Sequence, residues 1–154
     1  MSVLSCQIYA AFCGTGKSYL CDTFADKYVE LEDWNYRDGN FPKNYIKDIR
    51  AVIGNYEYIF IGTDPIVLKQ LNESGINIKL VYPKKELKSE YFKRFAMRGS
   101  HIDFVNAINK YWDVWLDELK GQSYCEHIIL NKDEYLEDIV RKADLKQGDG
   151  AGND

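Results

Sequence analysis

The chain has 154 residues and a net charge of −4 at pH 7, which suits one domain with a single core and gives no general attraction to a nucleic-acid backbone. Hydrophobic residues make up 45% and charged residues 29% of the chain, a composition typical of folded proteins. No apolar run reaches the ~20 residues of a membrane span, and the segment after Met1 lacks the basic start of a signal peptide. We expect a cytoplasmic protein with neither a membrane nor a nucleic-acid polymer as its partner; a homodimer is compatible with these features.

Short apolar runs alternate with longer stretches of helical period, which is typical of a parallel sheet flanked by helices. The predicted strands, in chain order, are 5–10, 28–31, 58–62, 76–82 and 126–130. The predicted helices lie at about 17–26, 45–53, 65–74, 86–98, 101–119 and 133–142. The end of the chain is rich in glycine and polar residues with nothing to bury, so we expect one domain over 1–142 and a disordered tail over 143–154.

A glycine-rich segment joins the first predicted strand to the first predicted helix. Residues 11–18, AFCGTGKS, match the phosphate-loop pattern G-x-x-x-x-G-K-[ST], with alanine in the first position. In that pattern the glycines let backbone N–H groups approach phosphate oxygens, the lysine reaches the outer phosphates, and the serine hydroxyl ligates Mg²⁺. We predict that ATP and Mg²⁺ bind at Ala11, Phe12, Cys13, Gly14, Thr15, Gly16, Lys17, Ser18 and Tyr19. The alternative is a glycine turn that caps a helix.

Acidic, aromatic and basic residues follow the second predicted strand. Asp33 lies at the sheet edge where open α/β folds bind ligands, so it is a candidate for holding magnesium with Ser18 or for holding an acceptor hydroxyl. The interleaved aromatic and basic residues of 34–50 suit a bound nucleotide, because rings stack on bases and arginines clamp phosphates. The predicted acceptor-binding residues are Asp33, Trp34, Arg37, Tyr45, Arg50 and Asp64. The alternatives are an acid that caps a turn and aromatic residues that fill the edge of the core.

The predicted helix over 86–98 carries Arg94 and Arg98, which are four residues apart and therefore share a face. Two guanidinium groups in this arrangement can close over transferring phosphates as a lid. The predicted catalytic residues are Lys17, Asp33, Arg94 and Arg98. The alternative is a solvated basic face near the carboxyl end of a helix.

The order of these segments, from about Ser5 to Val140, resembles the small phage-type P-loop nucleotide kinases related to deoxynucleoside monophosphate kinases and adenylate kinase. The resemblance implies an α/β, three-layer P-loop NTPase fold with a five-stranded parallel sheet in the order 2-3-1-4-5, and Mg-ATP in the loop. It implies lid arginines at Arg94 and Arg98, and the host cytoplasm as the location if a phage encodes the protein. Such kinases often have an Asp-Gly pair after the third strand, where this chain has Gly62-Thr63-Asp64, so the second acidic contact to magnesium stays open between Asp33 and Asp64.

These features favour a small-molecule kinase, since the sequence contains no N-K-x-D guanine signature. We predict ATP-dependent phosphoryl transfer to a nucleoside or deoxynucleoside monophosphate. The main alternative is a non-catalytic P-loop module that binds or sequesters a nucleotide and acts with a partner. A third reading is a slow NTPase without a fixed acceptor.

Overall fold

The structure of the protein is a computed structural model that describes residues 6–152, with side chains described up to Lys146. Within this range five strands form one all-parallel sheet in the order β2-β3-β1-β4-β5. The α/β class and the strand order agree with the prediction, whereas Ser5, the first residue of the predicted first strand, lies outside the described residues. The strands are β1 (Gln7–Ala11), β2 (Tyr28–Leu31), β3 (Tyr58–Ile61), β4 (Ile78–Pro83) and β5 (Glu126–Leu130).

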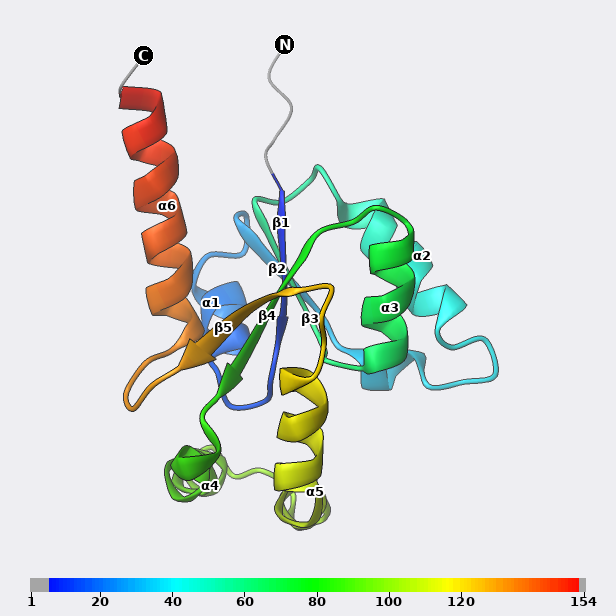
Figure 1. Cartoon of the computed structure of the whole chain (residues 1–154), viewed down its shortest axis with the longest axis vertical. Helices are drawn as coiled ribbons and strands as arrows, with labels where there is room; N and C mark the ends of the chain where they lie inside the picture. The colour runs from blue at the N-terminus through cyan, green and yellow to red at the C-terminus, as the bar shows by residue number, and fades with distance from the viewer. Residues whose placement is uncertain (1–5, 153–154) are drawn as a thin grey trace.

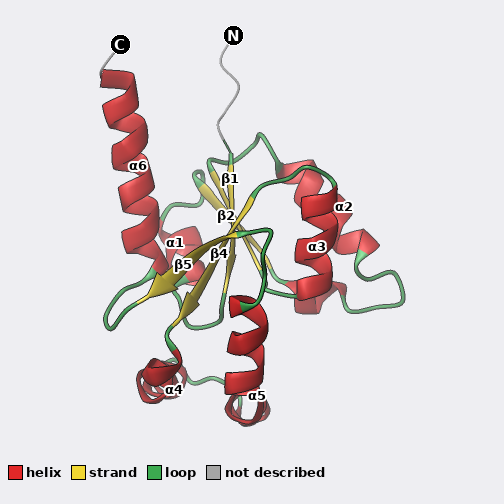
Figure 2. Cartoon of the chain, viewed as in Figure 1, coloured by secondary structure: helices red, strands yellow, loops and turns green. Residues whose placement is uncertain are grey.

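Helices cover both faces of this sheet and make three layers (Figures 1 and 2). The α-helices are α1 (Lys17–Thr23), α2 (Lys43–Val52), α3 (Pro65–Glu73), α4 (Lys88–Met97), α5 (Ile102–Lys120) and α6 (Leu136–Gly152). Two short 3₁₀ helices, η1 (Asp33–Tyr36) and η2 (Lys85–Leu87), follow β2 and β4. Side chains of α2, α3 and α5 pack on one face of the sheet, and those of α1 and α6 pack on the other. Among the described residues, no helix is long and apolar enough to cross a membrane.

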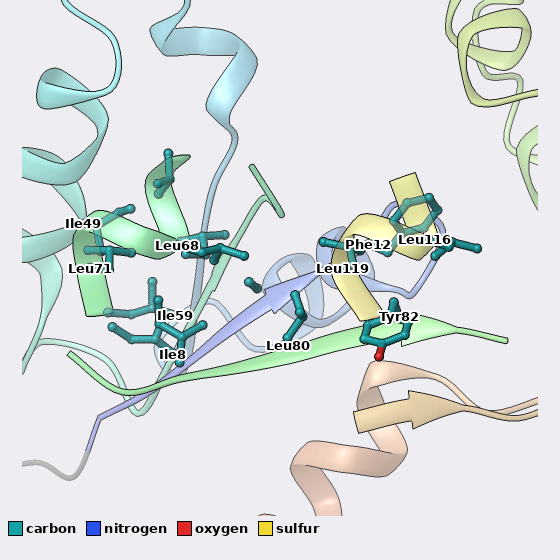
Figure 3. Close-up of a cluster of buried hydrophobic side chains, with 14 of the residues drawn as sticks. Ile8, Phe12, Ile49, Ile59, Leu68, Leu71, Leu80, Tyr82, Leu116 and Leu119 are labelled. Carbon is teal, nitrogen blue, oxygen red and sulfur yellow. The ribbon is translucent and has the colours of Figure 1, made fainter. Parts of the chain in front are cut away.

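Alternate residues of each strand enter two separate cores, because successive side chains of a strand point to opposite faces. Figure 3 shows the core on the side of α2, α3 and α5, where strand residues such as Ile8, Ile59 and Leu80 meet helix residues such as Leu68 and Leu116. The other core consists of Tyr9, Ala11, Leu20, Tyr28, Tyr58, Phe60, Val81, Leu130, Leu136 and Val140. Packing on both faces fixes the positions of the strands, and therefore the points at which the loops leave the sheet.

The carboxyl ends of the parallel strands meet at one edge of the sheet. In Figure 1 the arrows of β1 and β4 point toward the end of the molecule where α4 and α5 lie. The segments after β1, β2 and β3 also leave the sheet at this edge, so side chains far apart in sequence converge there. Trp112 of α5 is buried, and its indole N–H donates to the Lys85 carbonyl over 3.0 Å, which ties α5 to the segment after β4.

The end of the chain differs from the predicted disordered tail. Helix α6 begins at Leu136 rather than at residue 133, where Asp133 has a φ of 61°, and it continues past Lys142 to Gly152. The Asp144 carboxylate accepts a hydrogen bond from the Tyr58 hydroxyl over 2.6 Å and pairs with Lys27 Nζ over 2.6 Å. The prediction considered only apolar residues that the tail could bury, whereas these contacts, which tie the helix to the sheet, are polar. Residues 153–154 lie outside the described residues.

Truncation after Lys142 should lower the free energy of unfolding, because it removes Asp144 from Tyr58 and Lys27. We expect a loss of roughly 1–2 kcal/mol, of which the partly exposed ion pair between Lys27 and Asp144 supplies the smaller share. Urea unfolding measures the loss, and truncation after Lys146, which keeps Asp144, is the matched control. Equal stability of the two truncated chains would show that the Asp144 contacts do not hold α6 in place.

Candidate functional site

The loop between β1 and α1, residues 12–16, is built around two glycines with positive φ. Gly14 has a φ of 82° and Gly16 a φ of 102°. A Cβ atom on Gly14 would lie 2.9 Å from Tyr91 Cδ2 and 3.0 Å from Phe95 Cε1, so only glycine fits there. Thr15 is buried, and its hydroxyl donates to the Phe12 carbonyl over 2.8 Å within the loop. The loop conformation is therefore specified both by its own residues and by α4 above it.

Two clefts open beside this loop, each with a volume of about 360 Å³. The loop cleft is lined by Cys13, Gly14, Gly16, Lys17, Ser18, Tyr19, Glu30, Glu32, Arg94, Arg98, Phe104 and Tyr135. The acidic cleft is lined by residues 11–13, Lys17, Glu32, Asp33, Trp34, Arg37, residues 62–65, Phe104, Ile108, Trp115, Glu118 and Leu119. Cys13, Lys17, Glu32 and Phe104 line both clefts and mark their junction.

Lys17 lies at the junction because it follows the loop directly, at the first position of α1. Its ammonium donates to the Ala11 carbonyl at the end of β1 over 2.9 Å. Burial raises the pKa of the neighbouring Cys13 thiol to about 11, so this group is protonated at neutral pH and is no nucleophile. The junction thus offers a cation and the Glu32 carboxylate.

The two predicted lid arginines line the same cleft but are held differently. The Arg94 guanidinium donates to the Gly14 carbonyl over 2.8 Å and lies between the rings of Tyr91 and Tyr135, with its central carbon 4.2 and 4.0 Å from their centroids. Arg98 is exposed, and its Nε donates to the Ser100 hydroxyl over 2.9 Å. Arg94 is therefore a fixed part of the loop's wall, while Arg98 carries its charge on the open side of the cleft.

Two glutamates at the end of β2, Glu30 and Glu32, line the loop cleft together with Ser18. The Ser18 hydroxyl donates to Glu30 Oε1 over 2.9 Å. Burial, and then the adjacent Glu32 carboxylate, raise the pKa of Glu30 to about 7, while Lys17 opposes this rise. Asp33 does not share a cleft with Ser18, so the structure does not bring the two predicted magnesium ligands together. Glu30 has the position beside Ser18 that the sequence assigned to an aspartate.

Three predicted acceptor residues meet in the acidic cleft. Arg37 Nη2 donates to Asp33 Oδ2 over 2.9 Å and to Asp64 Oδ2 over 2.7 Å. Asp64 also caps α3, since its Oδ1 accepts from the backbone N–H of Ile66 over 2.9 Å. The three side chains therefore cross-link η1 to the start of α3. Trp34 lies at the rim, largely exposed, and its indole N–H donates to Glu32.

Tyr45 and Arg50 stand outside both clefts, which corrects their predicted role in binding an acceptor. Tyr45 is fully buried, and its hydroxyl donates to the Leu31 carbonyl over 2.6 Å and accepts from the Gly62 N–H over 3.1 Å, joining the ends of β2 and β3. Arg50 is exposed and lines a separate shallow groove with residues of α2 and with Gln70. Both lie on α2, whose buried face covers the sheet.

Several residues that line the clefts were not among the predicted site residues. Glu30 and Glu32 are two apart at a strand end, a spacing that places both on one face, and this signal was available. Tyr135 follows β5 at the same edge of the sheet, so its position was also accessible from the strand order. Phe104, Trp115 and Glu118 come from α5, where only the docking of the helix decides which residues reach a cleft.

In metal-free buffer, Glu30→Gln should make stability less dependent on pH. The folded-state pKa of about 7 lies above the ordinary 4.5, so between these values the folded state holds a proton that the unfolded state releases, and the free energy of unfolding of the wild type falls as pH rises. Glutamine stays uncharged, so the variant should gain stability relative to the wild type from about pH 5 to about pH 8. Urea unfolding at both ends measures this gain.

Glu73→Gln, an exposed glutamate of α3, is the matched control for loss of one carboxyl. A difference between Glu30→Gln and the wild type that stays constant with pH would contradict the buried arrangement of Glu30 beside Glu32.

Neither a protein-family model nor a curated protein sequence matches the chain. The residues that line the two clefts indicate which chemical groups each cleft could bind. The loop cleft joins a glycine-rich backbone to Lys17, Arg94 and Arg98, an arrangement suited to anionic groups. The acidic cleft gathers carboxylates and aromatic rings, which suit hydrogen-bond donors and flat apolar surfaces.

Proposed function

We propose that the protein is a P-loop phosphotransferase that moves the γ-phosphoryl group of Mg-ATP to a small acceptor. The observation that carries this proposal is the meeting of the loop cleft and the acidic cleft at Lys17 and Glu32. A triphosphate in the loop cleft would direct its terminal phosphate to this junction, where a molecule in the acidic cleft can reach it. A protein that only binds a nucleotide would not need a second cleft beside the terminal phosphate.

Residues suited to magnesium are present beside the loop. The Ser18 hydroxyl and the Glu30 carboxylate are in hydrogen-bond contact, and hydroxyl and carboxylate oxygens are ligands that Mg²⁺ prefers. Among the residues whose side chains the structure describes, no group of three or more His, Cys, Asp or Glu could hold a metal by itself. In the proposed complex, protein oxygens and phosphates would bind the ion jointly. Bound there, Mg²⁺ would neutralise charge on the phosphates. We assign Ser18 as a ligand and Glu30 as the nearby carboxylate, since Asp33 and Asp64 pair with Arg37.

Positive charge on the protein would do most of the catalytic work. Phosphoryl transfer needs positioning and stabilisation of the equatorial oxygens more than covalent help. Lys17 lies at the junction, and Arg94 and Arg98 line the loop cleft from α4 and its end. The contact of Arg94 with the Gly14 carbonyl orients this guanidinium before any ligand arrives, which lowers the cost of reorganisation.

The acceptor would bind among the aromatic and acidic residues of the acidic cleft. Trp34, Phe104 and Trp115 line it and can contact a ring, which supports an acceptor of nucleoside or nucleotide size. Its volume of about 360 Å³ lies within the ~300–1,000 Å³ range of small-molecule sites. The sequence resemblance favours a nucleoside monophosphate as this acceptor.

Product analysis tests the proposal. With ATP, Mg²⁺ and a panel of nucleosides and nucleoside monophosphates, the protein should form ADP in proportion to one class of acceptor, and Lys17→Ala should lower this turnover roughly 10²-fold or more. The exposed Lys69 of α3 gives a matched control, Lys69→Ala. ADP release that needs no acceptor would indicate a hydrolase. Near-normal turnover by folded Lys17→Ala would exclude the loop as the donor site.

Arg98→Ala should lower kcat roughly 10²-fold while the Kd for ATP changes less than about threefold, because its contact would tighten as charge develops on the transferring group. Calorimetric titration and the acceptor assay measure the two quantities. Arg94→Ala should weaken ATP binding as well, since it also frees the Gly14 carbonyl. Lys93→Ala, an exposed neighbour on α4, is the control. Parallel losses of affinity and turnover in Arg98→Ala would indicate a ground-state contact and favour a nucleotide-binding module.

A further inference from the structure

The acidic cleft is lined by more acidic than basic side chains. Among the described residues that line it, the acids are Glu32, Asp33, Asp64 and Glu118, and the cations are Lys17 and Arg37. Carboxylates therefore outnumber cations at this wall, and a molecule that already carries a phosphate dianion would enter against net negative charge.

Arg37, a cation of the acidic cleft, is already paired with two carboxylates. A single nitrogen, Nη2, serves both Asp33 and Asp64, at 2.9 and 2.7 Å, and the guanidinium lies over the Phe41 ring with its central carbon 4.1 Å from the centroid. One positive charge thus faces two carboxylates, of which Asp64 keeps only 14% of its side chain exposed. A phosphate that sought Arg37 would have to approach both of these anions.

The junction of the two clefts has the groups that a hydroxyl acceptor needs. Lys17 and Glu32 line both clefts, whereas Arg94 and Arg98 line the loop cleft and not the acidic cleft. The oxygen of a monophosphate is already ionised and needs no base, but an alcohol must lose a proton as it attacks. A carboxylate at the point of attack serves the alcohol and repels the phosphate.

From this arrangement, and resting on the proposed phosphotransferase function, we propose that the acceptor is an uncharged, ring-bearing molecule that presents a hydroxyl group, of the nucleoside class, rather than a nucleoside monophosphate. Trp34, Phe104 and Trp115 contact its ring, and the carboxylates of the acidic cleft accept hydrogen bonds from its hydroxyl groups.

The reaction balances with these partners alone. The acceptor oxygen forms a bond to the γ-phosphorus as the bond from that phosphorus to the bridging oxygen of ATP breaks, and the electron pair of that bond leaves with ADP. The hydroxyl proton passes to the Glu32 carboxylate, which releases it to water. The products are a phosphate monoester, ADP and a proton. Asp33 and Asp64, held by Arg37, orient the acceptor as positioning residues.

Matched acceptor pairs test the inference. Each nucleoside is compared with its own 5′-monophosphate, in kcat/KM with Mg-ATP and in affinity with the loop cleft filled by Mg-ADP. The nucleoside should be preferred at least about tenfold in both measurements, since one local charge pair is worth that much at short range. Equal use of the two, preference for the monophosphate, or binding of neither member of any pair would overturn the inference. A protein that turns over no acceptor refutes the proposed function, while the affinity measurements still decide the preference.

A charge variant checks the cause of the preference. Asp64→Asn keeps a side-chain oxygen that can cap α3 and removes one negative charge from the wall, so it should raise affinity for the monophosphate roughly three- to tenfold relative to the nucleoside. Asp113→Asn, an exposed acid of α5 that does not line the cleft, removes the same charge elsewhere and should leave the ratio unchanged. An unchanged ratio in Asp64→Asn, or an equal change in Asp113→Asn, would overturn the assignment of selectivity to the acidic cleft.

Discussion

The close approach of the Gly14 backbone to α4 is the constraint on which the site depends. A Cβ atom at Gly14 would lie 2.9 Å from Tyr91 and 3.0 Å from Phe95, which is closer than van der Waals contact. The Gly14 carbonyl also accepts a hydrogen bond from Arg94 over 2.8 Å. On the other side, the Leu136 N–H donates to the Thr15 carbonyl over 2.9 Å, so the start of α6 holds the loop as well. Two elements from distant parts of the chain therefore fix the shape of a five-residue loop, and they also bring Arg94 to it.

The site separates its charges in space. The loop cleft has the cations Arg94 and Arg98 with Glu30 as its own carboxylate, the acidic cleft has Asp33, Asp64 and Glu118 with Arg37 as its own cation, and Lys17 and Glu32 line both. In a chain with a net charge of −4, such a local separation would decide which ligand enters which cleft under the proposed function, because charges at close range outweigh distant charges that solvent screens.

The sheet makes this separation possible because all its strands run in one direction. Their carboxyl ends release the segments after β1, β2 and β3 at one edge, and the buried aromatic and aliphatic cores on both faces keep the strand ends in register. Tyr45 adds a hydrogen-bonded link between the ends of β2 and β3, beside the acidic cleft. Its aromatic ring looked like a ligand contact in the sequence, yet it serves as a support.

The sequence alone determined the α/β class and the loop at residues 11–18, since apolar periodicity and glycine spacing are local properties of the chain. The strand order was implied by the resemblance to P-loop nucleotide kinases and not by any local pattern, and the sheet has that order. It also placed Lys17, Ser18, Arg94 and Arg98 among the candidates, and the tertiary structure brings these four to one cleft. Only the tertiary structure decided that Glu30 lies beside Ser18, that Arg37 is held by two aspartates and that Asp144 ties α6 to Tyr58. Each of these depends on a contact between polar side chains from different elements, and the distance between such groups is set by how helices dock on the sheet, which no local pattern encodes.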